Sequence, residues 1–219
     1  MMIYSIPNPS DVLQQGDIFR YIPKVEISMN KLVAIKQIDQ STNQKPIETT
    51  WRKEIEDSQS VVYGLLPIKP VDAIVVTQDC DASRGMDISL CEIRKFSDVF
   101  HQTLPADDKY AKWIDVITKK SQVNQKWYYL PICKEIGFSC RMGVDFMSII
   151  RVNRIELEEM REDYRVAKLN DNVAKPHFRE RIANFFRRYP YNEWYPLNKK
   201  EYEEYVKDKG PVEPYEWHK

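Results

Sequence analysis

A short run of apolar and mostly β-branched residues, Ala73-Ile74-Val75-Val76-Thr77, constrains the fold more than any other feature of the chain. The run is too short for a helix, and uninterrupted runs of this kind are typical of buried central strands. It ends in a dense turn signal at 78–85, and apolar residues resume at 88–93. The sequence therefore predicts two paired strands, 73–77 and 88–93, joined by a turn.

Other segments predict further strands and helices around that pair. Alternating apolar residues after a glycine predict a strand at 16–23. Shorter patterns predict strands at 61–66, 127–132 and 142–150. Helical spacing and polar, helix-forming composition predict helices within 96–124, at 156–163, at 174–189 and after Asn198. Strands with inserted helices, followed by helices at the end, indicate an α+β fold, and about five short strands suit a small barrel.

The predicted helix at 174–189 carries the clearest apolar face. Its large apolar side chains lie within about 100° of arc on a helical wheel. They are Phe178, Ile182, Phe185, Phe186 and Tyr189. This spacing is typical of an amphipathic helix.

Composition excludes several classes of protein. With only 6 glycines, the chain has neither glycine-rich phosphate-binding loop, GxGxxG or GxxxxGK[ST]. Lys and Arg total 33, as do Asp and Glu, so no net charge draws the chain to nucleic acid or to a membrane surface. No apolar run approaches the roughly 18 residues of a membrane span, and the N-terminus lacks the features of a signal peptide. We therefore expect a cytoplasmic protein with no membrane partner.

The cysteines and histidines do not form a metal-binding pattern. The cysteines stand at positions 80, 91, 133 and 140 without a CxxC pair, and the histidines are scattered. We expect free thiols, no metal and no cofactor.

A polar cluster emerges directly from the predicted central strand, where functional residues are common. Its candidate binding residues are Gln78, Asp79, Cys80, Asp81 and Arg84. The two aspartates and Asp87 could hold a hard cation, but the spacing of an EF-hand loop fails because Leu90 stands at the expected glutamate position. Cys80 as a nucleophile would need a histidine partner. The alternative is a tight turn in which the aspartates accept hydrogen bonds from backbone N–H groups.

Arginines recur along the C-terminal region, and three of them are further candidate binding residues: Arg165, Arg181 and Arg188. Their guanidinium groups could contact phosphates or the carboxylates of a partner. Interleaved glutamates, such as Glu180, offer the alternative of internal ion pairs.

Three segments together resemble the MazF/PemK family of small SH3-like barrel proteins, best known as toxin endoribonucleases. The opening Gly16-Asp17-Ile18-Phe19, the central strand with its turn at 73–79, and the segment 144–154 are similar to family segments in order and spacing. A terminal helix within 169–186 matches in position. The resemblance implies a small SH3-like antiparallel β-barrel with inserted helices and a C-terminal helical extension, and it implies a homodimer.

The chain is about twice as long as a typical member of that family, and this excess defines the expected domains. Residues 1–189 would form the barrel domain, with insertions at 23–70 and 95–125. Residues 190–219 would form an aromatic and charged C-terminal extension.

The resemblance does not extend to the catalytic residues. In family ribonucleases an arginine precedes the central strand and a serine or threonine ends the next one, because phosphoryl transfer needs a cation and a proton carrier. Here those positions fall on Val71-Asp72 and within 92–94. The catalytic residues are therefore unknown, and an aspartate beside the phosphate would repel it.

Our first hypothesis is a non-catalytic binding or regulatory module in a bacterial stress or anti-phage defence system, with a protein or RNA partner. One alternative is a divergent endoribonuclease that uses Arg84, Arg94 or Arg165, and another is an assembly scaffold. A nuclease predicts an electropositive groove near the 78–84 turn. A binding module predicts an exposed aromatic or apolar surface, and a scaffold predicts a large symmetric interface.

Overall fold

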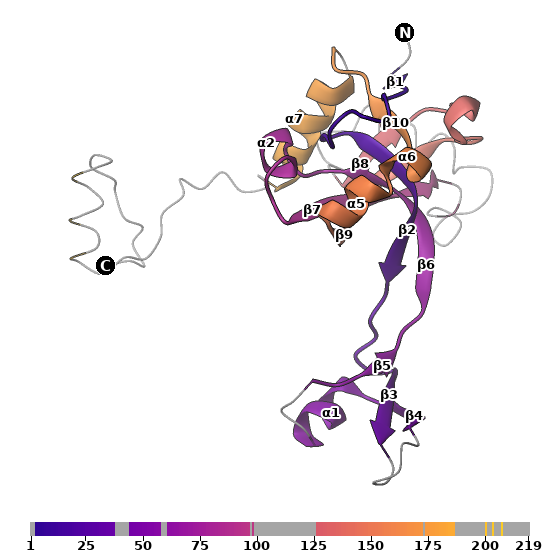
Figure 1. Ribbon diagram of the computed structural model, residues 1–219, viewed down its shortest axis with the longest axis vertical. Helices are drawn as coiled ribbons and strands as arrows, with labels where there is room; N and C mark the ends of the chain where they lie inside the picture. The colour runs from indigo at the N-terminus through magenta and orange to yellow at the C-terminus, as the bar shows by residue number, and fades with distance from the viewer. Residues whose placement is uncertain are drawn as a thin grey trace, which may run out of the picture. The chain divides into compact units, whose positions relative to one another are not determined.

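The computed structural model describes residues 3–37, 44–57, 61–96, 98, 126–172 and 174–186, together with positions 200, 203 and 207 (Figure 1). The chain divides into two compact units, Met1–Phe185 and Phe186–Lys219. The predicted division after residue 189 stays a prediction. The helices expected within 96–124 and after Asn198 lie outside the described residues, apart from isolated positions.

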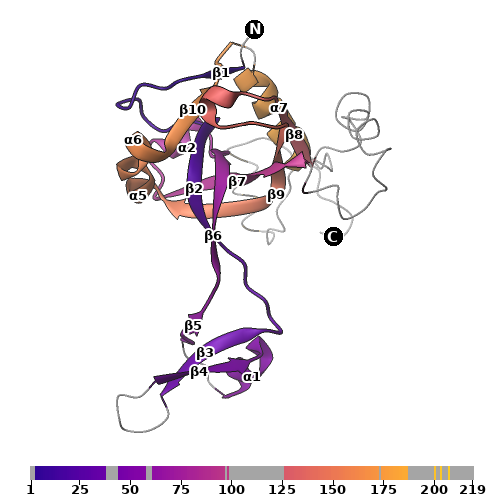
Figure 2. The ribbon, with the colours of Figure 1, turned by 90° about the vertical axis from the view of Figure 1, so that its right-hand side faces the viewer.

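The first unit contains a seven-stranded antiparallel sheet in the order β1-β10-β2-β6-β7-β9-β8 (Figure 2). Its strands are β1 (Tyr4–Ser5), β2 (Asp17–Val25), β6 (Ile68–Val75), β7 (Asp87–Lys95), β8 (Trp127–Leu130), β9 (Met142–Asn153) and β10 (Arg165–Leu169). The predicted pair of central strands is confirmed, since β6 and β7 are neighbours with Ile74 opposite Cys91. The α+β class is confirmed as well.

The sheet buries both of its faces in the region where β6 and β7 pair. Because successive side chains in a strand point to opposite faces, Ile74 contributes to one core and Val75 to the other. The helix α7 (Ala174–Phe186) packs on the first face, where Phe178 and Phe185 are buried. Two short helices, α5 (Arg154–Glu159) and α6 (Arg161–Tyr164), belong to the second face.

The predicted apolar face of α7 is confirmed only in part. Phe178 and Phe185 are buried and Ile182 is partly buried, but the side chain of Phe186 is 59% exposed. The predicted single helix at 156–163 is instead divided into α5 and α6, with Met160 between them. No helix in the described ranges has both the length and the apolarity needed to cross a membrane.

The two edge strands of the sheet, β1 and β8, approach each other through side chains. The Tyr4 hydroxyl donates a hydrogen bond of 2.9 Å to the carbonyl of Pro131, just after β8, and the Tyr4 ring meets Phe138 edge-on at 6.0 Å. Among the described strands no backbone ladder joins β1 to β8 and closes the sheet into a barrel.

Beyond the broad sheet, β2 and β6 continue as a two-stranded ribbon whose paired residues run to Val25 opposite Ile68. The ribbon places Pro23 opposite Pro70. A proline has no N–H to donate, and strands that contain one are found at sheet edges. This explains why, among the described residues, neither β7 nor β10 accompanies the ribbon.

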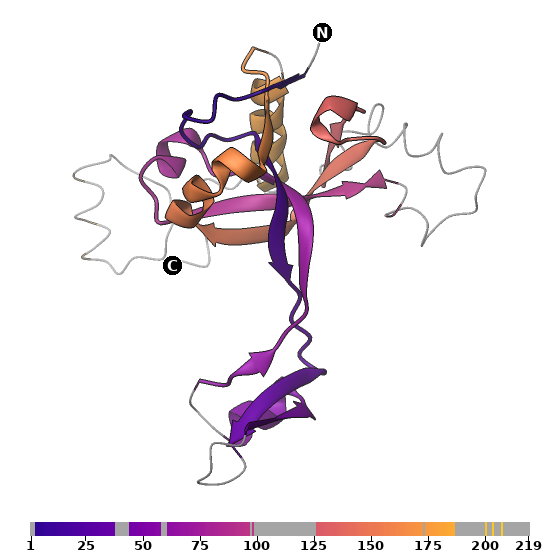
Figure 3. The same cartoon turned by 45° about the vertical axis from the view of Figure 1, so that its right-hand side comes forward.

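The residues between the two ribbon strands form a second, three-stranded antiparallel sheet in the order β4-β3-β5. Its elements are β3 (Leu32–Gln37), β4 (Gln44–Thr49), α1 (Trp51–Asp57) and β5 (Gly64–Leu65). The helix α1 lies against one face of this sheet (Figure 3), where Thr49 donates a hydrogen bond of 2.8 Å to the buried Glu54. This inserted sheet occupies most of the predicted insertion 23–70, and the predicted strand at 61–66 is present as the shorter β5.

Candidate functional site

The predicted polar cluster forms a single helical turn, α2 (Asp79–Ala82), at the end of β6. The carbonyl of Gln78 accepts the N–H groups of Asp81 and Ala82 at 3.0 and 2.8 Å, which closes the turn. The Asp79 carboxylate accepts the N–H of Gln15 at 2.8 Å. The cluster therefore adopts a tight turn in which an aspartate accepts a backbone N–H group, which is one of the three alternatives that the sequence left open.

Two cations of α7 reach the same carboxylate. Arg179 pairs with Asp79, and the Lys175 ammonium lies 3.3 Å from it. Although partial burial acts to raise the pKa of Asp79, the Gln15 N–H and these two cations hold it below its ordinary value. Asp79 is thus an ionised anchor that joins α7 to the end of β6.

Lys175 is only 5% exposed, and its ammonium group is fully engaged. It donates to the side-chain oxygen of Gln14 at 2.8 Å and lies 3.3 Å from both Asp79 and Asp171. The two cations and the two carboxylates cancel in charge. A network with this balance stabilises the docking of α7 and leaves no net positive field for a phosphate.

The remaining candidate residues of the turn, Gln78, Cys80, Asp81 and Arg84, are exposed. Arg84 makes an i,i+3 pair with Asp81 at 3.5 Å, and Cys80 is a free, exposed thiol. Asp87 is occupied by Arg151 instead of joining Asp79 and Asp81. Within the described ranges, no group of three or more His, Cys, Asp or Glu side chains could hold a metal ion.

Arg165 lies in the interior, away from that turn. Its side chain is 1% exposed and pairs at 3.1 Å with the equally buried Asp17. It also donates to backbone carbonyls of the N-terminal segment, including that of Asn8 at 2.7 Å. Burial raises the pKa of Asp17, while the Gln14 N–H and Arg165 act in the opposite direction. Arg165 therefore holds the segment before β2 on the sheet, and its guanidinium group is buried rather than exposed to a ligand.

Arg181 also has a structural partner. It donates a hydrogen bond of 3.2 Å to the carbonyl of Trp127 in the edge strand β8. The hydroxyl of Tyr4 occupies the Pro131 carbonyl just after the same strand. Side chains that occupy edge carbonyls protect a sheet from pairing with another chain. Arg188, the last candidate, lies outside the described residues.

Asp72 and Glu92 stand where the resemblance would place the ribonuclease residues, and both form ion pairs. Asp72 lies 3.4 Å from Arg20, and burial raises its pKa while Arg20 and Lys95 act to lower it. Glu92 accepts hydrogen bonds of 2.8 Å from Lys24 and from the hydroxyl of Ser148.

The third arginine of the nuclease alternative is also paired. Arg94 lies 3.7 Å from the buried Asp145, which Lys126 approaches to 3.3 Å.

Burial raises the pKa of the Cys91 thiol to about 12, with Asp145 acting in the same direction, so this thiol is not a nucleophile at neutral pH.

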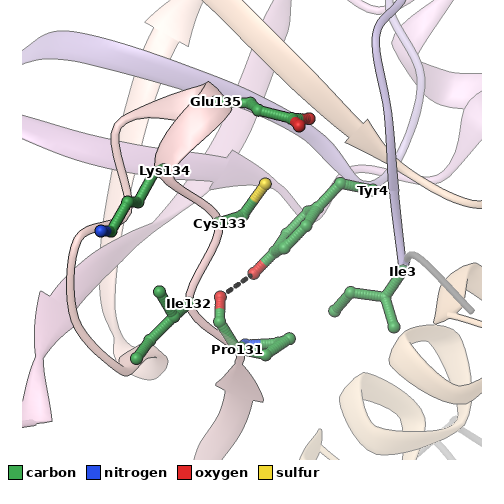
Figure 4. A pocket seen from close by; sticks show the side chains of 7 residues that line it. All are labelled: Ile3, Tyr4, Pro131, Ile132, Cys133, Lys134 and Glu135. Carbon is green, nitrogen blue, oxygen red and sulfur yellow. Dashed lines mark hydrogen bonds between the residues drawn. The ribbon is translucent and has the colours of Figure 1, made fainter.

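A pocket of about 410 Å³ lies where the two edges of the large sheet approach each other (Figure 4). It is lined by Ile3, Tyr4, Pro131, Ile132, Cys133, Lys134 and Glu135. The Tyr4 hydroxyl is occupied by the Pro131 carbonyl, and the remaining walls are mostly apolar. The pocket contains none of the residues that the sequence singled out.

The feature that sequence reasoning missed is a face of the inserted sheet that no described element covers. In this sheet Val33 lies opposite Glu48 and Leu65, and Ile35 lies opposite Pro46. Residues directly opposite each other share a face. The Ile35 N–H donates to the Tyr63 carbonyl at 2.8 Å, which places Tyr63 on that face as well.

The two faces of the inserted sheet differ in what covers them. Ala34 points to the side of α1 and is 1% exposed. The opposite side, which we call the open face, consists of Val33, Ile35, Pro46, Glu48, Tyr63 and Leu65. No described element covers this face, and Tyr63 and Leu65 are 71% and 54% exposed. Its only charged member is Glu48.

The whole inserted sheet is poor in buried apolar residues. In the described part of 26–67, Ala34 is the only buried apolar side chain, whereas nine large ones are exposed. The nine are Ile27, Met29, Ile47, Trp51, Ile55, Val61, Tyr63, Leu65 and Leu66. A signal for this was present in the sequence as scattered apolar residues, but only the strand register shows that Tyr63 and Leu65 share one face, which no described element covers.

Comparison of the chain with protein-family models, with curated proteins and with solved structures found no match.

Proposed function

We propose that this chain is a non-catalytic binding module whose partner is a protein that docks on the open face of the inserted sheet. The observation that carries the proposal is the exposure of Tyr63 and Leu65 on a sheet face that no described element covers. Exposed apolar surfaces on soluble domains mark interaction sites, and tyrosine is among the residues enriched at binding hot spots. An exposed surface of this kind is what a binding module requires.

Charge favours a protein over a nucleic acid as the partner. Residues 26–67 contain five basic residues, Lys31, Lys36, Lys45, Arg52 and Lys53. They also contain six acidic residues, Glu26, Asp39, Glu48, Glu54, Glu56 and Asp57, which leaves a net charge of −1. Binding to nucleic acid depends on phosphate contacts from clustered lysine and arginine. A surface that is apolar and slightly acidic lacks that attraction.

The large sheet supports the non-catalytic part of the proposal. Of the three arginines that a divergent nuclease could use, Arg165 is buried on Asp17 and Arg94 is paired with Asp145. Arg84 is exposed, but it lies beside Asp81. A phosphorane needs a cation whose charge is free to act on it.

We also propose that the large sheet is a divergent MazF/PemK-like barrel. The approach of β1 and β8 through Tyr4 and Pro131 is compatible with a divergent SH3-like barrel that has opened at this seam. In that case the inserted sheet would be a binding element that has been added to the barrel between β2 and β6. A cytoplasmic regulatory role in a bacterial stress or anti-phage system rests on the resemblance alone.

The test compares two variants of matched exposure. Leu65→Glu places a charge on the open face, and Ile155→Glu, at a site 57% exposed on α5, is the control. The full chain, tagged and expressed in its native cells, is used to capture partners with and without ribonuclease. We expect a ribonuclease-resistant protein that Leu65→Glu loses and Ile155→Glu keeps. Equal capture by both variants, or loss on ribonuclease treatment, would contradict the proposal.

A further inference from the structure

We infer that the partner binds as an extended segment that adds a strand to the free edge of β5. This inference rests on the proposed function and specifies the form in which the partner docks. The two outer strands of the inserted sheet, β4 and β5, differ in what their free edges offer to such a strand.

The edge of β4 is blocked by a proline. The N–H of Ile35 donates to the carbonyl of Tyr63, which lies just before β5. In an antiparallel ladder the N–H and C=O of one residue point to the same neighbouring strand, so Ile35 makes no backbone hydrogen bond with Pro46, its opposite residue in β4. The nitrogen of Pro46 therefore faces the free edge of β4, where it has no hydrogen to donate. Prolines at such positions prevent edge pairing.

Among the described strands, none pairs with the outer edge of β5. Since Ile35 and Tyr63 form a hydrogen-bonded pair, the next residue, Gly64, turns its N–H and C=O away from β3 and toward the free edge. Gly64 is exposed and carries no side chain that could obstruct a second backbone. The segment 61–68 contains no charged residue, so nothing on it repels an incoming apolar strand.

The added strand would extend the open face. Its alternate side chains would lie beside Tyr63 and Leu65, and the recognised segment is therefore expected to alternate apolar and polar residues. Affinity in this mode comes from backbone hydrogen bonds, and specificity comes from every second side chain.

The size of the open face argues against a globular partner or a second copy of this chain at this surface. The open face comprises six side chains. A stable interface between globular proteins uses roughly 20–30 residues on each side. A short strand that adds backbone hydrogen bonds to a small apolar face fits this area better.

The test selects displayed random peptides of about 12 residues on the full-length protein. The best binder is then measured against wild type, Leu65→Glu and Ile155→Glu, and the amide hydrogen exchange of the wild-type complex is recorded. We expect enrichment of alternating apolar sequences and about tenfold or greater weakening by Leu65→Glu only. The Gly64 N–H should exchange markedly more slowly in the complex than in the free protein.

Failure of the strand inference can be told apart from failure of the proposed function. A library without enriched binders, or a binder that leaves the Gly64 N–H unprotected, overturns the added strand. In either case a cellular partner that Leu65→Glu loses would still support protein binding. Chemical crosslinking of the free protein tests for a second copy. A crosslinked species of twice the chain mass that is lost in Leu65→Glu would identify a second copy as the occupant and overturn the inference.

Discussion

At the scale of single residues, the ionised side chains of the large sheet stabilise the fold. Arg165 shows this best, because its guanidinium neutralises Asp17 and binds carbonyls of the segment before β2. We expect Arg165→Met to lower the free energy of unfolding by about 3–5 kcal/mol, since it leaves a buried carboxylate unpaired. Urea unfolding measures this loss. Arg84→Met, at an exposed site, should change stability by less than about 0.5 kcal/mol, and similar losses in both variants would contradict the assignment.

The anchor role of Asp79 predicts a dependence on pH. Its pKa in the folded state is below its ordinary value, so its contribution is fully present above the ordinary Asp pKa and is lost as pH falls through the lowered value. At neutral pH, Asp79→Asn should cost about 1–3 kcal/mol because Lys175 loses a carboxylate partner. The difference from wild type should shrink in urea titrations below about pH 4. A constant difference at all pH values would contradict this account, and Asp81→Asn provides the exposed control.

At the scale of elements, the bulge in β2 stores backbone strain. Tyr21 has a φ of 60°, a value that glycine adopts without cost, and it stands where the β2–β6 register shifts. Both Tyr21→Gly and Tyr21→Ala remove the ring that meets Tyr164, so their difference isolates the backbone term. We expect the glycine variant to be the more stable by about 1 kcal/mol in thermal or urea unfolding.

Ile68 offers the matched control for this comparison. It is an exposed residue of β6 in the regular part of the β2–β6 ladder and has no positive φ. There the order should reverse, with Ile68→Ala more stable than Ile68→Gly. The same order at both positions would show that the Tyr21 backbone is not strained.

The central strands could be predicted from sequence because their signals are local. The β-branched run at 73–77, the turn after it and the resumed run at 88–93 specify a pair of strands without reference to the rest of the chain. The inserted sheet could not be predicted in the same way. Its strands are short and mixed in composition, and β5 is identified only by its pairing with β3.

The roles of the candidate residues were less predictable than the strands. The sequence correctly placed Asp79 at the end of a central strand, but its partners Lys175 and Arg179 lie about a hundred residues away. Whether an arginine is exposed to a ligand or already bound by the protein depends on such long-range contacts, as Arg165 and Arg181 show. The open face depends on strand register, and shifting register by one residue would move its side chains to the side of α1.

At the scale of the whole molecule, ion pairs stabilise the large sheet, whereas the inserted sheet presents apolar side chains. We expect the pure, folded protein to leave a long structured RNA intact, with or without EDTA, because the arginines described near the nuclease positions are paired. Gel analysis of the RNA is the measurement. Specific cleavage that is lost in an Asp79→Ala/Arg84→Ala double variant would contradict it and would place an active site at the 78–84 turn.

The central claim is that a protein contacts the open face, and site-specific photo-crosslinking in cells tests it most directly. The photoreactive residue p-benzoylphenylalanine is placed at position 63 on the open face and, in a control, at position 155 on α5. The account predicts a discrete crosslinked protein from position 63 alone, heavier than the chain and distinct from its dimer. Crosslinks that are equal at both positions, or absent from position 63, would contradict the claim.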